Sequence, residues 1–531
     1  MSALAASSGQ VACFPRWRLP RYRALALSRI SLAHVWMAVP LLVAGLGSGL
    51  MPLESIDYWW TVKLGELIWY TGGLPNGDQL VFTPIREQVI DGQWLAQLIL
   101  YAVHRLGGVE AALALRMAVA LAVAVLLLRS CVGRRAGIRA VAVSIASGLM
   151  LILPGLAVRP QMLAVVPFLI VARAATSPPS RPLPALGVAA SVAFWANVHG
   201  SFILAYVLLG AALVEAGWRY LRGEDVDRLP RLASLAALCA VAPLANPFGA
   251  GLAAYVLDTV LFNAVGSTVG VLGVEWGAPA LRSSYGGAFF ASVLVVMALL
   301  GRGHRPRLGE ALLMLVFGLL ALQAVRNVLW WGLVVTPYIA RALGTEELIS
   351  PLGRQRVTGP ASSGGGVPLG QPAVNAACLA LFALIVAACL PWWRPLSPFP
   401  ASRTVLVDPS TPVLVAEYLA ANPTHGELFN FTDWGAYLAW RLGPGQQVFI
   451  DDRFELHPAE VWRDYAAISR GHVSWEELLG QYGVTRLVLD PASQDGLVQA
   501  VRRSPDWRPA YEDQQALVFE RGSMEVVAPW P

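Results

Sequence analysis

The sequence predicts a mostly α-helical, polytopic membrane protein: a bundle of about eleven transmembrane helices followed by a C-terminal soluble α/β domain. Hydrophobic residues make up 56% of the 531-residue chain and charged residues only 14%, which is too apolar for an ordinary soluble protein. Near residue 400 the long apolar runs give way to short apolar strands that alternate with helices. That alternation is typical of an α/β domain.

The N-terminus is expected to be cytoplasmic. Residues 1–33 carry several arginines, from Arg16 to Arg29, and no acidic residue. By the positive-inside rule, such a segment stays inside. The apolar run that follows has no clear small-residue cleavage site, so we interpret it as a retained membrane anchor.

The transmembrane domain is predicted over residues 34–392, with a first outer loop at 52–108. Within that loop, residues 93–106 are apolar but short for a crossing, so we expect them at the membrane interface. Arginine-rich inner loops then alternate with outer loops, and one outer loop has a predicted interfacial helix near 251–265. The predicted spans are 34–51, 109–128, 138–156, 161–175, 184–199, 201–218, 231–246, 286–301, 309–325, 327–342 and 373–391.

The C-terminal α/β domain is predicted over residues 400–531 and is expected outside the cytoplasm. A segment of about 130 residues is long enough to bury one core. We expect helices at 414–422, 433–442, 474–482 and 496–503, and strands at 427–431, 447–451, 485–490 and near the end of the chain.

Composition argues against two functional classes. The arginines are scattered between apolar runs and form no basic stripe, so nucleic acid is not an expected partner. The five cysteines have no metal-site spacing and none falls in the soluble domain, so neither a zinc site nor a disulfide framework is predicted.

The predicted topology gathers reactive side chains on one side of the membrane. Taken singly, each has an ordinary explanation, such as snorkelling of an arginine to lipid headgroups or a helix stop at an Asn-Pro pair. Together they suit group transfer from an anionic donor, because arginines hold phosphate through charge-assisted hydrogen bonds and a carboxylate accepts a proton or binds a divalent metal. These outer residues are Asp57, Arg159, His199, Asn246, Glu275 and Arg326.

Two segments each allow two interpretations. Residues 54–97 fit a solvated loop with interfacial aromatic helices, or a membrane-surface active site centred on Asp57. After the strand V-F-I, an Asp could cap the next helix while Arg453 pairs with a neighbour. Alternatively, Asp451, Asp452 or Arg453 points from the strand end toward the first outer loop, because ligands bind at that end of open α/β sheets.

The residues also resemble a known superfamily. The pattern D-Y-W-W-x-x-x-L-G-E-L-I-W-Y-T-G-G-L-P-N-G-D, followed by W-L-A-Q, is similar to the first outer loop of the C-type (GT-C) glycosyltransferases. Further segments resemble one largely uncharacterised bacterial branch, so the resemblance covers nearly the whole chain. They are R-P-Q at 159–161, W-A-N-V-H-G at 195–200, N-P-F-G at 246–249, E-W at 275–276, R-N at 326–327, D-W-G-A-Y-L-A-W-R-L at 433–442 and V-F-I-D-D-R at 448–453.

The resemblance implies an integral membrane glycosyltransferase. It would move a hexosyl or pentosyl group from a polyprenyl-phosphate-linked donor to a glycan, lipid or protein acceptor, on the outer face of the cytoplasmic (inner) membrane. Membrane lipids are further expected partners. Two alternatives stay open: a non-catalytic scaffold or lipid-binding protein that retains the fold, and a transporter. The transporter fits less well, because transporters place ionisable groups near mid-membrane rather than at one rim.

The resemblance and the shared side of the membrane suggest roles for particular residues. Asp57, His199 and Glu275 are the predicted catalytic residues. The predicted substrate-binding residues are Arg159, Gln161, Asn246, Arg326, Asn327, Asp451, Asp452 and Arg453. No cofactor is firmly expected, and a divalent Mg or Mn ion would use Asp57 and Glu54. Two departures from related proteins argue against a metal. Thr61 stands where those proteins often have histidine. They also often have a second acid close to the first, whereas here the nearest is Glu54, three residues before Asp57.

Overall fold

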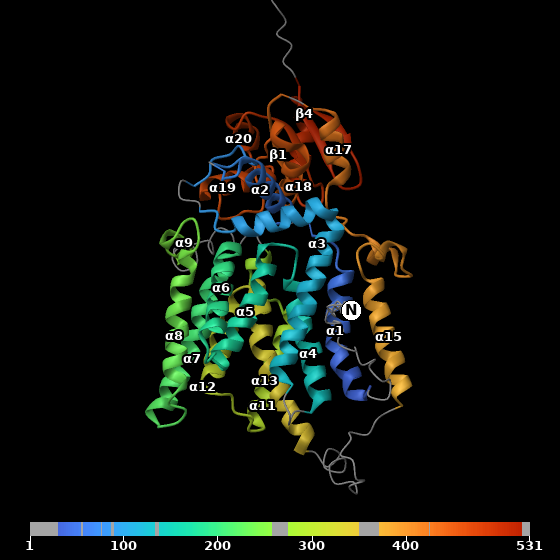
Figure 1. Cartoon of the computed structure of the whole chain (residues 1–531). Coiled ribbons are helices and arrows are strands. Elements are labelled where there is room, and N and C mark those ends of the chain that lie inside the picture. Colours follow the sequence, from blue (N-terminus) through green and yellow to red (C-terminus); the bar gives the residue numbers. More distant parts are fainter. Residues whose placement is uncertain are drawn as a thin grey trace, which may run out of the picture.

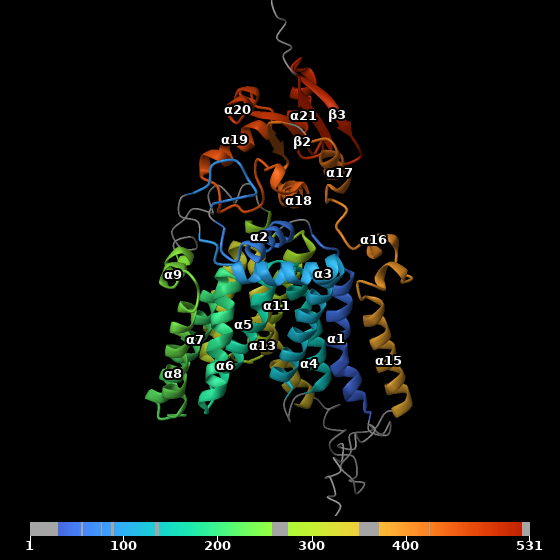
Figure 2. The ribbon, with the colours of Figure 1, turned by 45° about the horizontal axis from the view of Figure 1, so that its top comes forward.

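A bundle of long helices forms the body of the protein, and an α/β domain sits on one end of it (Figure 1). This computed structural model describes residues 30–54, 57–75, 77–86, 90–132, 137–257, 274–349, 371–423 and 425–522. The bundle contains α1 (Leu32–Leu50), α3 (Trp94–Cys131), α4 (Ile138–Ile152), α5 (Pro160–Thr176), α6 (Pro182–Val198), α7 (Leu204–Leu221), α8 (Arg228–Val241), α11 (Ser284–Gly301), α12 (Leu308–Gln323), α13 (Val328–Ile349) and α15 (Pro372–Ala388). Two shorter helices, α2 (Tyr58–Thr71) and α9 (Ala250–Leu257), lie at the end of the bundle that faces the domain (Figure 2).

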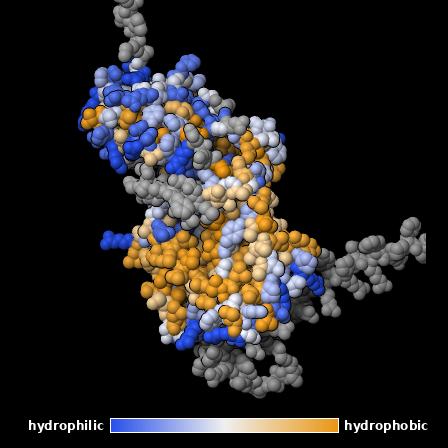
Figure 3. All heavy atoms as spheres, turned by 90° about the vertical axis from the view of Figure 1, so that its left-hand side faces the viewer, coloured by the Kyte–Doolittle hydropathy of each residue, from blue (hydrophilic) through white to orange (hydrophobic). Residues whose placement is uncertain are grey.

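Length and hydropathy identify the bundle as a membrane domain. Five of the described helices are long and apolar enough to cross a bilayer: α1, α3, α4 with the turn after it, α7 with the turn before it, and α11. Four more, α5, α6, α12 and α15, are apolar but shorter. Hydrophobic side chains cover much of the bundle in Figure 3, whereas the domain is mostly hydrophilic. The polytopic helical class is therefore confirmed, and the number of spans stays a prediction.

A break inside α3 shapes the first outer loop. Gly107 and Gly108 leave the helical conformation, and Gly108 has a φ of 62°, which favours glycine. The part of α3 before the break lies across the end of the bundle, and the part after it runs along the bundle (Figure 1). The break falls between the interfacial segment predicted at 93–106 and the span predicted at 109–128, and the placement of both relative to the membrane stays a prediction.

Helix α2 links the bundle to the domain. On one side, a side chain at Gly65 would clash with the carbonyl oxygen of Gln97 in α3, so the close packing of these two helices requires glycine here. On another side, the ring of Trp59 lies 5.0 Å from that of Tyr437 and 4.3 Å from that of Trp440, measured between centroids. Both partners belong to a helix of the α/β domain, so aromatic packing holds the two parts together.

The C-terminal domain has a mixed four-stranded sheet in the order β1-β2-β4-β3. Strands β1 and β2 are parallel, and the other two pairs are antiparallel. The strands are β1 (Glu427–Asn430), β2 (Val484–Leu489), β3 (Trp507–Glu512) and β4 (Leu517–Arg521), and the helices are α16 (Ala401–Thr404), α17 (Val413–Ala421), α18 (Thr432–Leu442), α19 (Ala459–Ser469), α20 (Trp475–Gln481) and α21 (Asp495–Arg503). The predicted α/β class is confirmed, whereas the exact division at 34–392 and 400–531 stays a prediction.

Two details of this domain differ from the sequence prediction. Residues 447–451 form no regular strand: Val448 makes isolated bridges to β1 and to the first outer loop. The backbone nitrogen of Phe449 then donates to Oδ1 of Asn430 at 3.0 Å, so a side chain takes the place of the next ladder bond. Helix α19 was not predicted, although it buries residues on one face, as an amphipathic helix does.

Some predictions fall on residues outside the described part of the chain. These are the basic segment up to residue 29, most of the interfacial helix predicted near 251–265, and positions 350–370 of the inner loop. Helix α9 covers the beginning of that predicted interfacial helix.

Candidate active site

A cavity of about 190 Å³ lies where the bundle meets the α/β domain. Bundle loops, the first outer loop and the segment after Val448 all contribute to its wall. The lining residues are Asp57, Trp60, Gln93, Arg159, Pro160, Gln161, His199, Glu275, Trp276, Arg326, Asp433, Asp452, Arg453, Phe454 and Glu455. The structure thus brings together Asp57, Arg159, His199, Glu275 and Arg326, which the sequence placed on one side of the membrane.

Asp57 precedes α2 with an unusual backbone conformation. Its φ is 65°, a region that costs a non-glycine residue about 1–3 kcal/mol. Its backbone nitrogen donates to Oδ2 of Asp452 at 2.6 Å, and its carbonyl oxygen accepts from the hydroxyl of Thr61 at 2.5 Å. The Asp57 carboxylate accepts from Nε1 of Trp60 at 3.2 Å. Neighbours on both sides therefore hold Asp57 in place.

Arg159 lies immediately before α5, whose first residue is Pro160, a favoured position for proline. Its side chain is only 7% exposed, and Nη1 lies 2.7 Å from Oε2 of Glu275 and 3.4 Å from Oδ2 of Asp57. Burial raises the pKa of Glu275, but the charge of Arg159 and its hydrogen bond outweigh burial and lower the net pKa. Glu275 is thus held as an anion that neutralises part of the charge of Arg159.

Arg326 lies in the short turn between α12 and α13. Its guanidinium carbon is 4.2 Å from the ring centroid of Trp276, a cation–π contact. Nη2 donates to Oε1 of Gln161 at 3.4 Å. No carboxylate of the described residues forms an ion pair with Arg326, so its charge faces the cavity without a fixed counter-ion.

His199 connects α6 to the turn before α7. Its Nδ1 accepts from the backbone nitrogen of Ser201 at 3.1 Å, and this bond assigns the ring proton to Nε2. Burial, followed by the charges of Arg326 and Arg159, lowers the pKa of His199 to about 3. The imidazole is therefore neutral at ordinary pH and can donate a hydrogen bond from Nε2.

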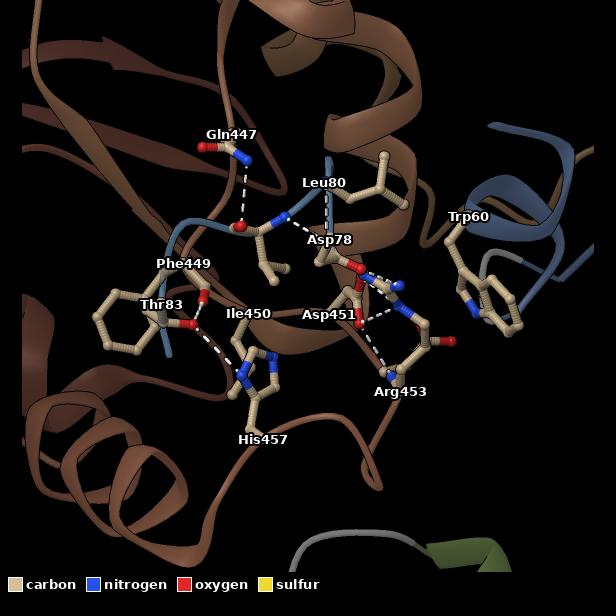
Figure 4. Close-up of polar contacts among 12 residues, drawn as sticks. Trp60, Asp78, Leu80, Thr83, Gln447, Phe449, Ile450, Asp451, Arg453 and His457 are labelled. Atoms are coloured by element: carbon tan, nitrogen blue, oxygen red, sulfur yellow. Dashed lines mark hydrogen bonds and ion pairs between the residues drawn. The ribbon is translucent and has the colours of Figure 1, made fainter. Parts of the chain in front are cut away.

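Each of the two interpretations of the D-D-R segment holds for part of it. Arg453 pairs with Asp451 at 2.6 Å and with Asp78 of the first outer loop at 2.5 Å (Figure 4). Asp451 is fully buried and does not line the cavity, as expected for an ordinary junction. Asp452, in contrast, lines the cavity and binds the backbone of Asp57. One Asp is thus part of the domain interior and the next faces the loop.

Asp452 and Glu455 bring further carboxyl groups to the cavity. Burial, then the charges of Asp57 and Asp451, raises the pKa of Asp452 well above its ordinary value. Oδ1 of Asp452 is buried and has no hydrogen-bond partner among the residues described. Burial is also the largest cause that raises the pKa of Glu455, and the charge of Asp57 adds to it. These two groups favour the protonated form relative to an exposed carboxyl.

Three predicted substrate-binding residues do not line the cavity. Asn246 is buried, and its amide nitrogen donates to Oδ1 of Asn197 at 3.0 Å while its oxygen accepts from the backbone of Phe248, so it fixes a turn. Asn327 donates to the carbonyl of Leu320 at 3.0 Å, which closes the end of α12. The third is Asp451, which is buried inside the domain and pairs there with Arg453.

Other cavity residues were missed by the sequence prediction. Glu455 follows the D-D-R segment by two residues, which was the available signal. Trp276 stands beside the predicted Glu275, and Trp60 belongs to the tryptophan pair after Asp57. Only the folded backbone brings these three residues to the wall of the cavity.

The residues present do not form a ready metal site. Among the residues that the structure describes, no group of three His, Cys, Asp or Glu side chains converges as metal ligands do. One oxygen of Asp57 accepts from Trp60 and the other faces Arg159. Glu54 does not line this cavity but an adjoining acidic cleft, with Asp408. The predicted pairing of Asp57 and Glu54 around Mg or Mn is therefore not supported by their arrangement, and we derive no step through a metal.

The fold, in contrast, matches known structures. The oligosaccharyltransferase of Archaeoglobus fulgidus in the apo form aligns with 92% of this chain and 75% of its own length, with a TM-score of 0.52 and 11% identity. The chain has the GT-C fold. The GT-C fold is also that of ArnT from Cupriavidus metallidurans bound to undecaprenyl phosphate, which aligns over 93% of this chain and 98% of its own, with a TM-score of 0.48 and 13% identity. No model of a known protein family and no curated protein sequence matches.

The long apolar helices of the described chain, together with this fold, support a multi-pass membrane protein. Its cavity is built where the loops at one end of the bundle meet the α/β domain. The GT-C resemblance first seen in sequence patterns is thus confirmed at the level of fold, and fold alone does not determine chemistry.

Proposed function

We propose that this protein is an inverting glycosyltransferase. It transfers a hexosyl or pentosyl group from a polyprenyl-phosphate-linked donor to a glycan, lipid or protein acceptor, on the outer face of the cytoplasmic membrane. The supporting observation is that Asp57, Arg159 and Arg326 meet in one cavity at the end of a membrane bundle, beneath the α/β domain. A carboxylate beside two arginines is the combination that sugar transfer from a phosphate donor needs.

In this proposal the donor phosphate binds at Arg326. That side chain is stacked on Trp276 and has no carboxylate partner among the described residues, so binding phosphate breaks no existing ion pair. Arg159 adds a second positive group, partly neutralised by Glu275. The polyprenyl chain then extends from the cavity toward the lipid. Gln161, whose Oε1 accepts from Arg326, donates from its amide nitrogen to a phosphate oxygen.

The chemistry follows from the position of Asp57. The acceptor hydroxyl oxygen attacks the anomeric carbon from the side opposite the phosphate, and its proton passes to the Asp57 carboxylate. The bond between the anomeric carbon and the phosphate oxygen breaks, and its electron pair leaves on the polyprenyl phosphate, where the arginines stabilise the charge. Neutral His199 donates a hydrogen bond from Nε2 to the bound substrate. Glu275 orients Arg159 through their ion pair.

The test is transfer of a labelled sugar from a polyprenyl-phosphate donor by the purified full chain. Asp57→Asn should abolish transfer and leave the thermal unfolding profile intact, because asparagine keeps the shape but accepts no proton. Asp225→Asn is the matched control, since Asp225 also has positive φ, 46°, but lies in the turn between α7 and α8. Binding of the donor without turnover in the wild-type protein would instead favour a lipid-binding scaffold.

A further inference from the structure

A second cavity lies at the end of the bundle away from the α/β domain. Its volume is about 310 Å³, and we call it the distal cavity. It is enclosed by the last turns of α3 and α5, the first turns of α8 and α12, and parts of α7 and α13. Helix α5 begins at the candidate active site and ends here, so the two cavities stand at opposite ends of the same helices (Figure 1).

The distal cavity is apolar inside and positive at its edge. Phe168, Leu169 and Leu333 are among the residues that supply its inner wall. Four arginines and two glutamates line the same cavity. Counted as formal charges, the lining therefore carries a net charge of +2.

The two glutamates already have partners. Glu215 pairs with Arg228 at 3.0 Å and accepts from the backbone nitrogen of Gly309 at 3.0 Å. A Cβ at Gly309 would lie 2.7 Å from Glu215, so glycine allows this contact. Glu310 accepts from Nη2 of Arg341 at 2.7 Å. The ion pairs thus fix the wall and leave two other arginines to supply the net charge.

Those two are Arg173, at the end of α5, and Arg307, just before α12. Both line the cavity and are exposed. Neither guanidinium forms an ion pair with any carboxylate in the part of the chain that the structure describes. An anionic group at the edge of the cavity would therefore find two free, charge-assisted donors.

We propose that the distal cavity binds an anionic membrane lipid from the leaflet opposite the α/β domain. The lipid phosphate contacts Arg173 and Arg307, and an acyl chain enters the apolar part between the helices. Charge complementarity selects an anion, and the apolar wall selects a lipid over free phosphate, which would leave that wall unfilled. This site is independent of the proposed sugar transfer.

The experiment uses the full chain, purified and delipidated in detergent, and follows thermal unfolding as lipid is added. The probes are short-chain phosphatidylglycerol, the zwitterionic phosphatidylcholine of equal chain length, and inorganic phosphate. A ligand that binds only the folded protein raises the unfolding midpoint. We expect a saturable rise with phosphatidylglycerol, a smaller one with phosphatidylcholine and none with phosphate.

The double variant Arg173→Gln/Arg307→Gln should weaken phosphatidylglycerol binding by about tenfold or more. The matched control is Arg181→Gln/Arg305→Gln, which removes two exposed arginines from loops at the same end of the bundle but outside the cavity lining. Equal lipid shifts in both double variants would overturn the proposal. A rise with phosphate as large as with the lipid would also overturn it, because the acyl chain would then play no part. Native mass spectrometry of retained lipid gives a second readout that does not depend on unfolding.

Discussion

The backbone nitrogen of Asp57 lies 2.6 Å from a carboxylate oxygen of Asp452, although 395 positions separate the two residues. Because an unfavourable φ persists only when its surroundings hold it, this bond makes the α/β domain part of the support for the proposed catalytic base. The domain is thus more than a cover over the cavity.

Asp452→Ala should lower the turnover number for sugar transfer by about tenfold or more. It removes the acceptor of the Asp57 backbone N–H and leaves that part-buried donor unsatisfied. Asp452→Asn keeps an oxygen in the same place, so it should retain a larger share of the activity. Turnover is measured at saturating donor, with circular dichroism as a check on folding. Wild-type turnover in the alanine variant would show that the link does not position Asp57.

The stability of the protein should fall as pH rises because of Asp452. Burial, followed by the charges of Asp57 and Asp451, raises its pKa above the ordinary 3.8. A carboxyl with a higher pKa in the folded state binds its proton more tightly there. Its contribution is therefore complete below the unfolded pKa and is lost as pH rises through the folded pKa.

Asp452→Asn cannot ionise, so its unfolding free energy relative to wild type should increase as pH rises from about 4 to about 8. Denaturant unfolding across that range measures the difference. Asp506→Asn, an exposed carboxylate of the same domain, is the control and should follow the wild-type curve. A difference between Asp452→Asn and wild type that stays constant with pH would contradict the assignment.

Arg326→Gln should raise the KM for the polyprenyl-phosphate donor by about tenfold, because a charge-assisted hydrogen bond to phosphate is lost. Trp276→Ala should raise the KM less, since the guanidinium remains but loses its stacking partner. Arg282→Gln removes an exposed arginine just before α11 and serves as the control. If Arg326→Gln and Arg282→Gln give the same KM, the phosphate binds elsewhere.

Gly65→Ala should destabilise the protein by about 1–3 kcal/mol, because the new methyl group meets the backbone of α3 at Gln97 and must be accommodated by strain. Gly210→Ala is the matched helical substitution: nothing lies within 4 Å of the added carbon, so it should be neutral or stabilising, by up to about 1 kcal/mol. Thermal unfolding in detergent compares the two. Similar effects from both would mean that α2 and α3 move apart easily.

Much of the cavity could be predicted from the sequence, for a simple reason. Span length and arginine placement determine which end of each helix a residue occupies, and Asp57, Arg159 and Glu275 all follow from that alternation. The alternation does not say whether a side chain at that end faces the cavity. Asn246 occupies the expected end, yet its amide is used by Asn197 of a neighbouring helix, a contact that depends on how the helices pack.

The D-D-R segment shows a second limit. Strict alternation along an extended segment would put Asp451 and Arg453 on one side and Asp452 on the other, yet Asp452 and Arg453 both line the cavity and Asp451 does not. The side chain of Asn430 binds the backbone at Phe449 and Ile450, so the expected strand ends early, and the chain bends at Asp452. No local pattern in the sequence reveals a contact between residues so far apart.

The bond between Asp57 and Asp452 also has a consequence for the order of events during biosynthesis. At a synthesis rate of about 5–20 residues per second, roughly 20–80 s pass between the two residues. During that interval every bundle helix after α1 is made, while Asp57 lacks the acceptor that holds its backbone. The nascent chain therefore carries an incomplete candidate active site until the α/β domain has folded. A ribosome that stops before residue 452 releases a membrane protein without the contact that holds Asp57.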